Sequence, residues 1–499
     1  MFEKITPEEA GISSRTVLRF IKKLEKRGAF THGLLFMRNG KIFTEAYWQP
    51  FHQEFSHRMY SQTKSLVSLA IGLLEEEGKL TLEDKIAAHF PEKIDGELPA
   101  YLGEQTVREM LLMTTAGMPY SWFLAGDKDR THLYFNDDRK THPSGTLWQY
   151  DSAGSQVLCS LVEKLSGKTL LDYLKEKLFN EMGCFQSATV LKAPNGDSWG
   201  DSAMVCTLRD MAAVGQLVMN YGVWKGKRLM NERYLREATS KRTDNTETVH
   251  YSTCHQGYGY QIWRVCGNGF AFIGMGDQLT MCYPDKGLLF ACVSDNQGAG
   301  NLIREAILAN LEDMFVDEIK DEALPENAEA QAELQALIEG LQLRSLQGEP
   351  DSIFRKELSG KEYVCEENPM GITKFSFLFH DEKGGEFHYT NQQGDKILPF
   401  AVNGNVFAKF PQFGYSDEYG ATPTTNGFLY DAAFSCAWLE EKKLRLLVQI
   451  VDRYFGNLSM TFSFKGNEVY AVFAKSAEYF LTEYHGALIG KRRDTACNS

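Results

Sequence analysis

Ser61 and Lys64 stand three residues apart in the run Tyr60-Ser61-Gln62-Thr63-Lys64-Ser65, where a long apolar segment begins. Residues with this spacing lie on one face of a helix, so the lysine amine can reach the serine hydroxyl. A serine hydroxyl is a weak nucleophile at neutral pH and needs such a base nearby. The start of a helix also favours a developing oxyanion. The pattern indicates a serine nucleophile, with an ordinary helix cap and a solvated lysine as the alternative.

The segment that follows bears on these two interpretations. Lys64 to Glu77 is apolar almost all round, with Leu66, Val67, Leu69, Ala70, Ile71, Leu73 and Leu74. A helix of this kind is expected at the centre of its domain. A lysine held there loses its proton more easily than one in water, which favours the catalytic interpretation.

Two further blocks accompany this helix. Leu111-Leu112-Met113-Thr114-Thr115-Ala116-Gly117-Met118-Pro119 lies about 45 residues later, and Pro143-Ser144-Gly145-Thr146-Leu147-Trp148-Gln149-Tyr150-Asp151-Ser152 leads into another helix. With Ser61–Lys64 and 70–84, they resemble the class C β-lactamase and esterase-type family, related to penicillin-binding proteins. In the middle block, Met and Ala stand where that family usually has His and Ser. The resemblance spans about residues 8 to 310 and implies an α+β fold, an antiparallel sheet flanked by helices.

The resemblance implies roles for Tyr150 and Ser152. In this family the second motif is Tyr-x-Asn or Tyr-x-Ser, and its tyrosine acts as base toward the serine and acid toward the leaving group. Ser152 is implied to support a hydrogen bond to lysine or substrate. Tyr134-Phe135-Asn136 and Tyr389-Thr390-Asn391 share the spacing. The first lacks the flanking helix block and the second lies in a C-terminal domain, so neither is favoured.

The third motif of the family has no literal copy. His255-Gln256-Gly257 has the letters but comes one strand too early, so the better counterpart is Phe272-Ile273-Gly274-Met275-Gly276-Asp277-Gln278. That run resembles the form in 6-aminohexanoate-dimer-hydrolase-like members. Gly274 is expected to keep the strand open to substrate, and the N–H groups of Met275 and Ser61 to form the oxyanion hole.

Two residues of this run bear on the substrate. Phe272 replaces the Lys or His that helps to hold a β-lactam carboxylate, which argues against β-lactam hydrolysis. Gln278 is expected either to face the site or to be solvated.

Ser294-Asp295-Asn296 follows the last strand and is interpreted as a chance match to a class A motif. The aromatics of 120–123 and 134–135 are equally consistent with a binding-site wall and with a core lid.

Bulk composition excludes some functions. The 499 residues carry a formal net charge of −13, which argues against nucleic acid or an anionic membrane as the main partner. The ten cysteines are scattered without a CxxC pair, so no zinc or thioredoxin-type site is indicated. No metal or organic cofactor is needed. Neither a signal peptide nor a transmembrane run is evident, and a cytoplasmic location is the default expectation.

The chain is expected to form three parts. Residues 1–316 form the catalytic domain, with a hairpin over 33–47, strands at 257–265, 270–273, 280–283 and 288–294, and a closing helix over 301–315, all in one sheet built from both ends of the segment. Residues 317–350 are expected to be an acidic helical connector. Residues 351–499 show short β segments typical of a small antiparallel barrel or sandwich, which loosely resembles the lipocalin-like barrels of some family members. A homo-oligomer is compatible with this organisation.

The sequence therefore predicts a serine hydrolase that cleaves an amide or ester of a small molecule or peptide through an acyl-enzyme. A D-amino-acid-specific peptidase and a carboxylesterase are the two enzyme alternatives that stand closest. A β-lactamase comes third, and a non-catalytic ligand-binding member of the fold is the alternative from another class.

Overall fold

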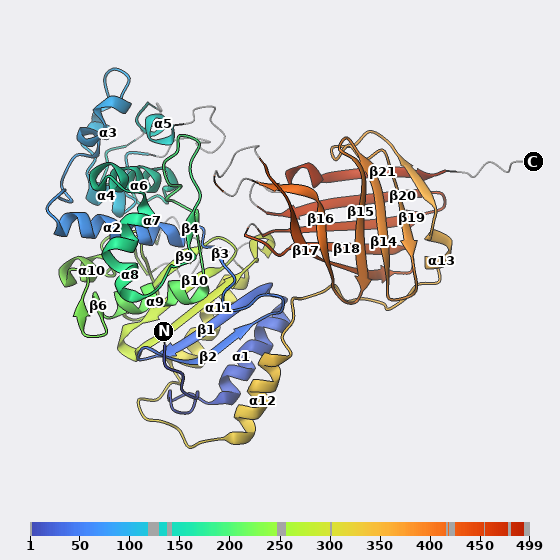
Figure 1. Ribbon diagram of the computed structural model, residues 1–499, viewed down its shortest axis with the longest axis horizontal. Coiled ribbons are helices and arrows are strands. Elements are labelled where there is room, and N and C mark those ends of the chain that lie inside the picture. Colours follow the sequence, from blue (N-terminus) through green and yellow to red (C-terminus); the bar gives the residue numbers. More distant parts are fainter. Residues whose placement is uncertain are drawn as a thin grey trace, which may run out of the picture. The chain divides into compact units, whose positions relative to one another are not determined.

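The computed structural model describes residues 2–117, 129–136, 142–246, 256–299, 302–415, 418, 425–453, 455–477 and 481–493. The chain divides into two compact units, with the boundary between Leu341 and Gln342. Figure 1 shows the helices and strands of both. None of the helices in these ranges has both the length and the apolar character that crossing a bilayer requires.

The first unit is organised around a six-stranded antiparallel sheet. Its order is β2 (Lys41–Tyr47), β1 (Thr31–Arg38), β11 (Leu288–Ser294), β10 (Gln278–Tyr283), β9 (Phe270–Gly274) and β8 (Trp263–Arg264). β1 and β2 form the expected hairpin, with Asn39 and Gly40 at φ 48° and 80°, as a tight two-residue turn requires. One sheet is therefore built from both ends of the segment, as the sequence predicted.

Helices cover both faces of this sheet, and successive residues of β1 point to opposite faces. Phe36 packs in the core with α1 (Ser14–Arg27) and α11 (Leu302–Leu311), whereas Leu35 packs in the core with α2 (Gln62–Glu76), α6 (Ser152–Ser166) and α9 (Leu208–Met219). β1 is buried along its whole length because both faces are covered.

The segment expected to be a connector belongs to this unit. α12 (Ala328–Glu339) packs on α1, as Figure 1 shows. Leu334 and Leu341 are buried in the same core as Phe36. The apolar stripe of α12 therefore completes the first unit, whose N-terminal stretch continues to Leu341 rather than ending at 316.

Shorter elements complete the first unit. They are α3 (Ala100–Gly103), α4 (Val107–Leu111), α5 (Arg130–Asn136), α7 (Leu170–Leu174), α8 (Asn180–Met182), α10 (Glu232–Ala238), β3 (His57–Arg58), β4 (Thr189–Val190), β5 (Met204–Cys206), β6 (Val223–Trp224) and β7 (Lys227–Arg228). β5 pairs with β3, which ends at Arg58 shortly before Ser61, and this pairing brings the loop around Asp201 toward the start of α2.

The second unit is an antiparallel β-barrel. Its strands are β12 (Glu362–Cys365), β13 (Lys374–Phe379), β14 (Gly384–Asn391), β15 (Gly394–Val402), β16 (Val406–Tyr415), β17 (Thr425–Glu440), β18 (Lys443–Ile450), β19 (Asn457–Lys465), β20 (Glu468–Ser476) and β21 (Gly486–Arg492), with α13 (Arg355–Leu358) before them. β12 pairs with β21, and β15 contacts β17 in parallel, which closes the sheet. Phe375, Phe377, Phe387 and Phe462 fill the interior, so the barrel predicted from the short β segments is confirmed.

Candidate active site

Ser61 lies at the point where the backbone turns sharply into α2. It occupies the N-cap position with φ −66° and ψ −6°, and its side chain makes no capping hydrogen bond. Tyr60 before it has φ 47°, a left-handed conformation that costs energy for a tyrosine and often marks a functional site. The Thr63 hydroxyl donates to the Tyr60 carbonyl at 2.7 Å and helps to hold this turn. A partly exposed hydroxyl that caps nothing is available for chemistry.

Lys64 lies one turn further along α2, with its amine against the serine. The side chain is 1% exposed, and its Nζ donates to Ser61 Oγ at 2.8 Å. It also donates to the backbone carbonyl of Asp201 at 2.8 Å. The carboxylate of Asp201, also 1% exposed, lies 3.8 Å from the amine. The alternative of a solvated lysine beside a capping serine is therefore wrong.

Tyr150 also lies close to the lysine amine. Its ring centroid lies 5.1 Å from Lys64 Nζ, and the ring stacks on Trp263 with centroids 5.5 Å apart. Asp151 caps α6 by accepting from the Gly154 N–H at 2.9 Å, and the Thr115 hydroxyl donates to the same carboxylate at 2.9 Å. Thr115, from the sequence block 111–119, therefore helps to hold Asp151 of the second motif, and stacking on Trp263 orients Tyr150.

Ser152 is the first residue of α6 and is partly exposed. Within the described ranges, none of the hydrogen bonds involves its hydroxyl, and the lysine instead donates to Ser61 and Asp201. The role expected for Ser152 toward lysine is taken by the Asp201 carbonyl, while a role toward substrate stays a prediction.

The β9–β10 turn lies beside the start of α2. A β-carbon at Gly274 would overlap the carbonyl oxygen of Met59. The glycine therefore permits close approach of β9 to the chain just before Ser61. We had expected a glycine here to keep the strand open to substrate, and the structure gives this other reason for it. Met275 follows in the turn and is 36% exposed.

Two residues of the same run are buried. Phe272 is fully buried in the core under α2, so its side chain is not placed to contact a substrate. Gln278 is also fully buried, and its amide donates to the carbonyls of Met275 at 3.1 Å and Ser294 at 2.6 Å. It neither faces the site nor is solvated. It holds the turn that carries Met275.

The run Ser294-Asp295-Asn296 contributes to the same turn. The Asn296 N–H donates to the Gly276 carbonyl at 3.2 Å, and its side-chain oxygen accepts from the Phe30 N–H at 2.8 Å. Burial raises the pKa of Asp295 to about 7. These residues support the β9–β10 turn, a structural role that resemblance to a motif did not predict.

The other candidates with similar spacing lie elsewhere. Tyr134 is buried on α5 and accepts from the Gln105 amide at 2.8 Å, and burial raises its pKa well above the usual range. Tyr389 lies in the barrel, hydrogen-bonded to Tyr484 at 2.9 Å. His255 and the aromatics 120–123 lie outside the described residues.

Two residues that sequence reasoning missed connect the parts of the site. Gln261, at φ 58°, accepts the Ser155 hydroxyl of α6 on its amide oxygen at 2.8 Å and the Ser65 hydroxyl of α2 on its backbone carbonyl at 2.8 Å. Asp201 approaches Lys64 from the loop before β5. Neither has a local sequence signal, because each acts through residues far away in the chain.

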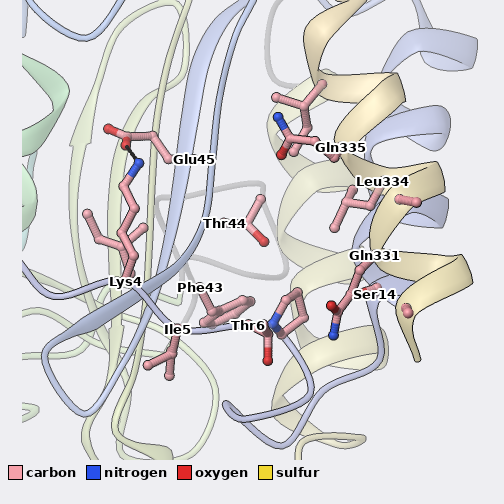
Figure 2. A pocket seen from close by; sticks show the side chains of 15 residues that line it. Lys4, Ile5, Thr6, Ser14, Phe43, Thr44, Glu45, Gln331, Leu334 and Gln335 are labelled. Atoms are coloured by element: carbon pink, nitrogen blue, oxygen red, sulfur yellow. Dashed lines mark ion pairs between the residues drawn. The ribbon is translucent and has the colours of Figure 1, made fainter. Parts of the chain in front are cut away.

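Some features of the molecule lie apart from this site. A cavity of about 510 Å³ lies between the N-terminal segment, β2 and α12 (Figure 2), and neither Ser61 nor Lys64 lines it. Eight cysteines, Cys159, Cys184, Cys206, Cys266, Cys282, Cys292, Cys365 and Cys436, are free thiols. In the ranges that the structure describes, no three His, Cys, Asp or Glu side chains are grouped so as to hold a metal ion.

The fold is shared with known proteins. The Beta-lactamase family model matches residues 18–311, and the chain belongs to this family. The 6-aminohexanoate-dimer hydrolase of Paenarthrobacter ureafaciens is 24% identical over 281 residues, which cover 53% of this chain and 72% of that protein.

Solved structures agree with the fold. A Bacillus anthracis protein provisionally assigned as a 6-aminohexanoate-dimer hydrolase superposes with a TM-score of 0.53 at 18% identity, over 64% of this chain and 86% of its own. The structure of SurE with D-Leu has a TM-score of 0.50 at 15% identity, over 84% of this chain and 93% of its own.

Proposed function

We propose that this protein is a serine hydrolase that cleaves an amide or ester bond through an acyl-enzyme on Ser61. The observation that carries the proposal is the 2.8 Å hydrogen bond between Lys64 Nζ and Ser61 Oγ at the start of a buried helix. The Tyr150 ring, with its centroid 5.1 Å from the lysine amine, completes the set. Membership of a family of hydrolases supports the same chemistry.

The reaction follows from these positions. Ser61 Oγ attacks the carbonyl carbon of the substrate while its proton passes to Tyr150, assisted by Lys64. The oxyanion accepts from the backbone N–H groups of Ser61 and Met275. Collapse of the tetrahedral intermediate expels the amine or alcohol, which takes the proton from Tyr150. Water then attacks the acyl-enzyme by the same route, releases the acid and restores Ser61.

The substrate range is narrowed by two observations. Phe272 is buried and supplies no cation for a substrate carboxylate, so a linear amide or ester is favoured over a β-lactam. The Tyr150 ring lies beside the amine of Lys64 and stacks on Trp263, and such rings favour an apolar group next to the scissile bond. Linear amides of 6-aminohexanoate type, D-amino-acid amides and short-chain esters form the panel to test.

The deciding experiment is covalent labelling read by intact mass. The wild-type protein is incubated with a fluorophosphonate and, separately, with a fluorescent penicillin, alongside Ser61→Ala and the control Ser166→Ala at the end of α6. We expect one fluorophosphonate adduct per chain in wild type and control, and none in Ser61→Ala. No adduct on folded wild-type protein would favour the non-catalytic ligand-binding alternative. A stable penicillin adduct would favour β-lactamase or penicillin-binding activity.

A further inference from the structure

Asp201 lies where it can determine what the catalytic lysine does. Its backbone carbonyl accepts from Lys64 Nζ at 2.8 Å, and its carboxylate oxygen lies 3.8 Å from the same atom. Both side chains are 1% exposed. A buried charge without a partner is strongly destabilising, so a carboxylate and an amine at this distance are expected to be charged together.

The fold holds this loop in place from two sides. The Gln156 side chain on α6 accepts from the Gly200 N–H at 3.0 Å and donates to the Ser198 carbonyl at 2.9 Å. A β-carbon at Gly200 would overlap Cys159 on the same helix, so only glycine lets the loop lie this close. Arg58, just before the nucleophile, donates to the Ser202 carbonyl at 2.9 Å. Asp201 is therefore fixed between α6 and β3.

From this geometry we infer that Asp201 is a positioning residue that keeps Lys64 as an ammonium group, so that Tyr150 is the base that takes the Ser61 proton. This inference rests on the proposed function. An ammonium has three N–H donors and no lone pair, so it donates to Ser61 Oγ and cannot accept the serine proton. The carbonyl and the carboxylate of Asp201 both stabilise that charged form. Tyr150, whose ring centroid lies 5.1 Å from the amine, is therefore assigned as the acceptor of the proton.

The charged and titratable neighbours shown by the described residues agree with this assignment. Lys64 faces the Asp201 carboxylate and Tyr150 faces Lys64. Cys159 on α6 has a pKa well above the usual range because of burial, with Asp201 among the acidic groups that add to it, so it stays a neutral thiol. The Arg58 guanidinium is engaged with Ser202 and lies 4.5 Å from the Trp199 ring centroid.

The first test is the pH dependence of fluorophosphonate acylation in wild type and Asp201→Asn, which keeps the shape and the backbone carbonyl but removes the charge. We expect acylation at the optimum to fall about tenfold or more, and the alkaline limb of the profile to begin about one pH unit lower, because the ammonium form is no longer supported. The control Asp210→Asn removes a buried carboxylate that caps α9. It should lower the melting temperature without moving either limb.

The second test needs no activity. Thermal unfolding of Lys64→Met, Asp201→Asn and the double variant forms a cycle. We expect the double variant to recover at least half of the Tm lost by the worse single variant, because no unpaired charge is left buried. If the Tm losses of the two single variants simply add in the double variant, Lys64 and Asp201 are not paired. If they are coupled but Asp201→Asn has the wild-type pH profile of acylation, Asp201 has no part in the chemistry. If the cycle shows coupling but the wild-type protein takes no fluorophosphonate label, the ion pair is real and the proposed hydrolase function has failed.

Discussion

Gly274 on β9 and Met59 before the nucleophile lie so close that the strand backbone occupies the space of a side chain. A β-carbon at Gly274 would overlap the Met59 carbonyl oxygen. The chain segment that delivers Ser61 and the turn that delivers Met275 are therefore in direct contact through their backbones. This contact couples the position of the nucleophile to that of the proposed oxyanion hole.

Gly274→Ala should separate these two segments. The added methyl meets backbone rather than a flexible side chain, so β9 must move away from Met59. We expect the acylation rate with a fluorophosphonate to fall tenfold or more, since a displacement near 1 Å at a reacting group costs about a hundredfold. Gly103→Ala, on α3 with open space around the added carbon, should label at the wild-type rate. An unchanged rate in Gly274→Ala would contradict the proposed oxyanion hole.

Gln278→Met should destabilise the β9–β10 turn that carries Met275. The substitution keeps the approximate volume of the side chain but leaves the carbonyls of Met275 and Ser294 without their donor. Losing the partner of a buried polar group costs about 1–3 kcal/mol. Urea unfolding should show a loss of stability in that range together with slower acylation. If stability falls while the acylation rate stays at the wild-type value, Gln278 is structural and does not position the turn for chemistry.

Tyr150→Phe removes the phenol and keeps the ring that stacks on Trp263. Loss of a general base typically slows a reaction by about 10²–10⁴-fold, and we expect acylation to slow within that range. The melting temperature should change little because Tyr150 is only partly buried. Retention of most activity at neutral pH would make Lys64 the base and would contradict the role given to Asp201.

Asp295 should make stability depend on pH. Burial raises its pKa from 3.8 to about 7. The folded protein therefore binds this proton more tightly than the unfolded chain does. The resulting stabilisation is complete below about pH 4 and is lost as the pH rises through 7. The difference is on the order of a few kcal/mol.

Asp295→Asn removes this titration and keeps an oxygen that can accept from Gln297, which donates to Asp295 at 2.8 Å. The Tm difference between pH 5 and pH 8 should be smaller in this variant than in wild type, as measured by differential scanning fluorimetry. Asp285→Asn, which removes an exposed carboxyl, should keep the wild-type difference. Equal pH dependence in wild type and Asp295→Asn would show that another group is responsible.

Local sequence determined the elements that carry the chemistry. The spacing of Ser61 and Lys64 together with the apolar run after them is enough to predict a buried helix with both groups on one face, because helix periodicity fixes that relationship. Asn39-Gly40 similarly determined the hairpin turn. The barrel followed from the short β segments after residue 351, whereas the fold class of the first unit was implied by the family resemblance.

Only the tertiary structure decided which residues contact these groups. Asp201 meets Lys64 across 137 residues, and Gln278 reaches Ser294 on the neighbouring strand. Phe272 occupies the core rather than the site, because the strand places alternate residues on opposite faces and α2 covers its face. Contacts between segments far apart in the chain depend on how strands and helices pack, and packing leaves no short sequence signal.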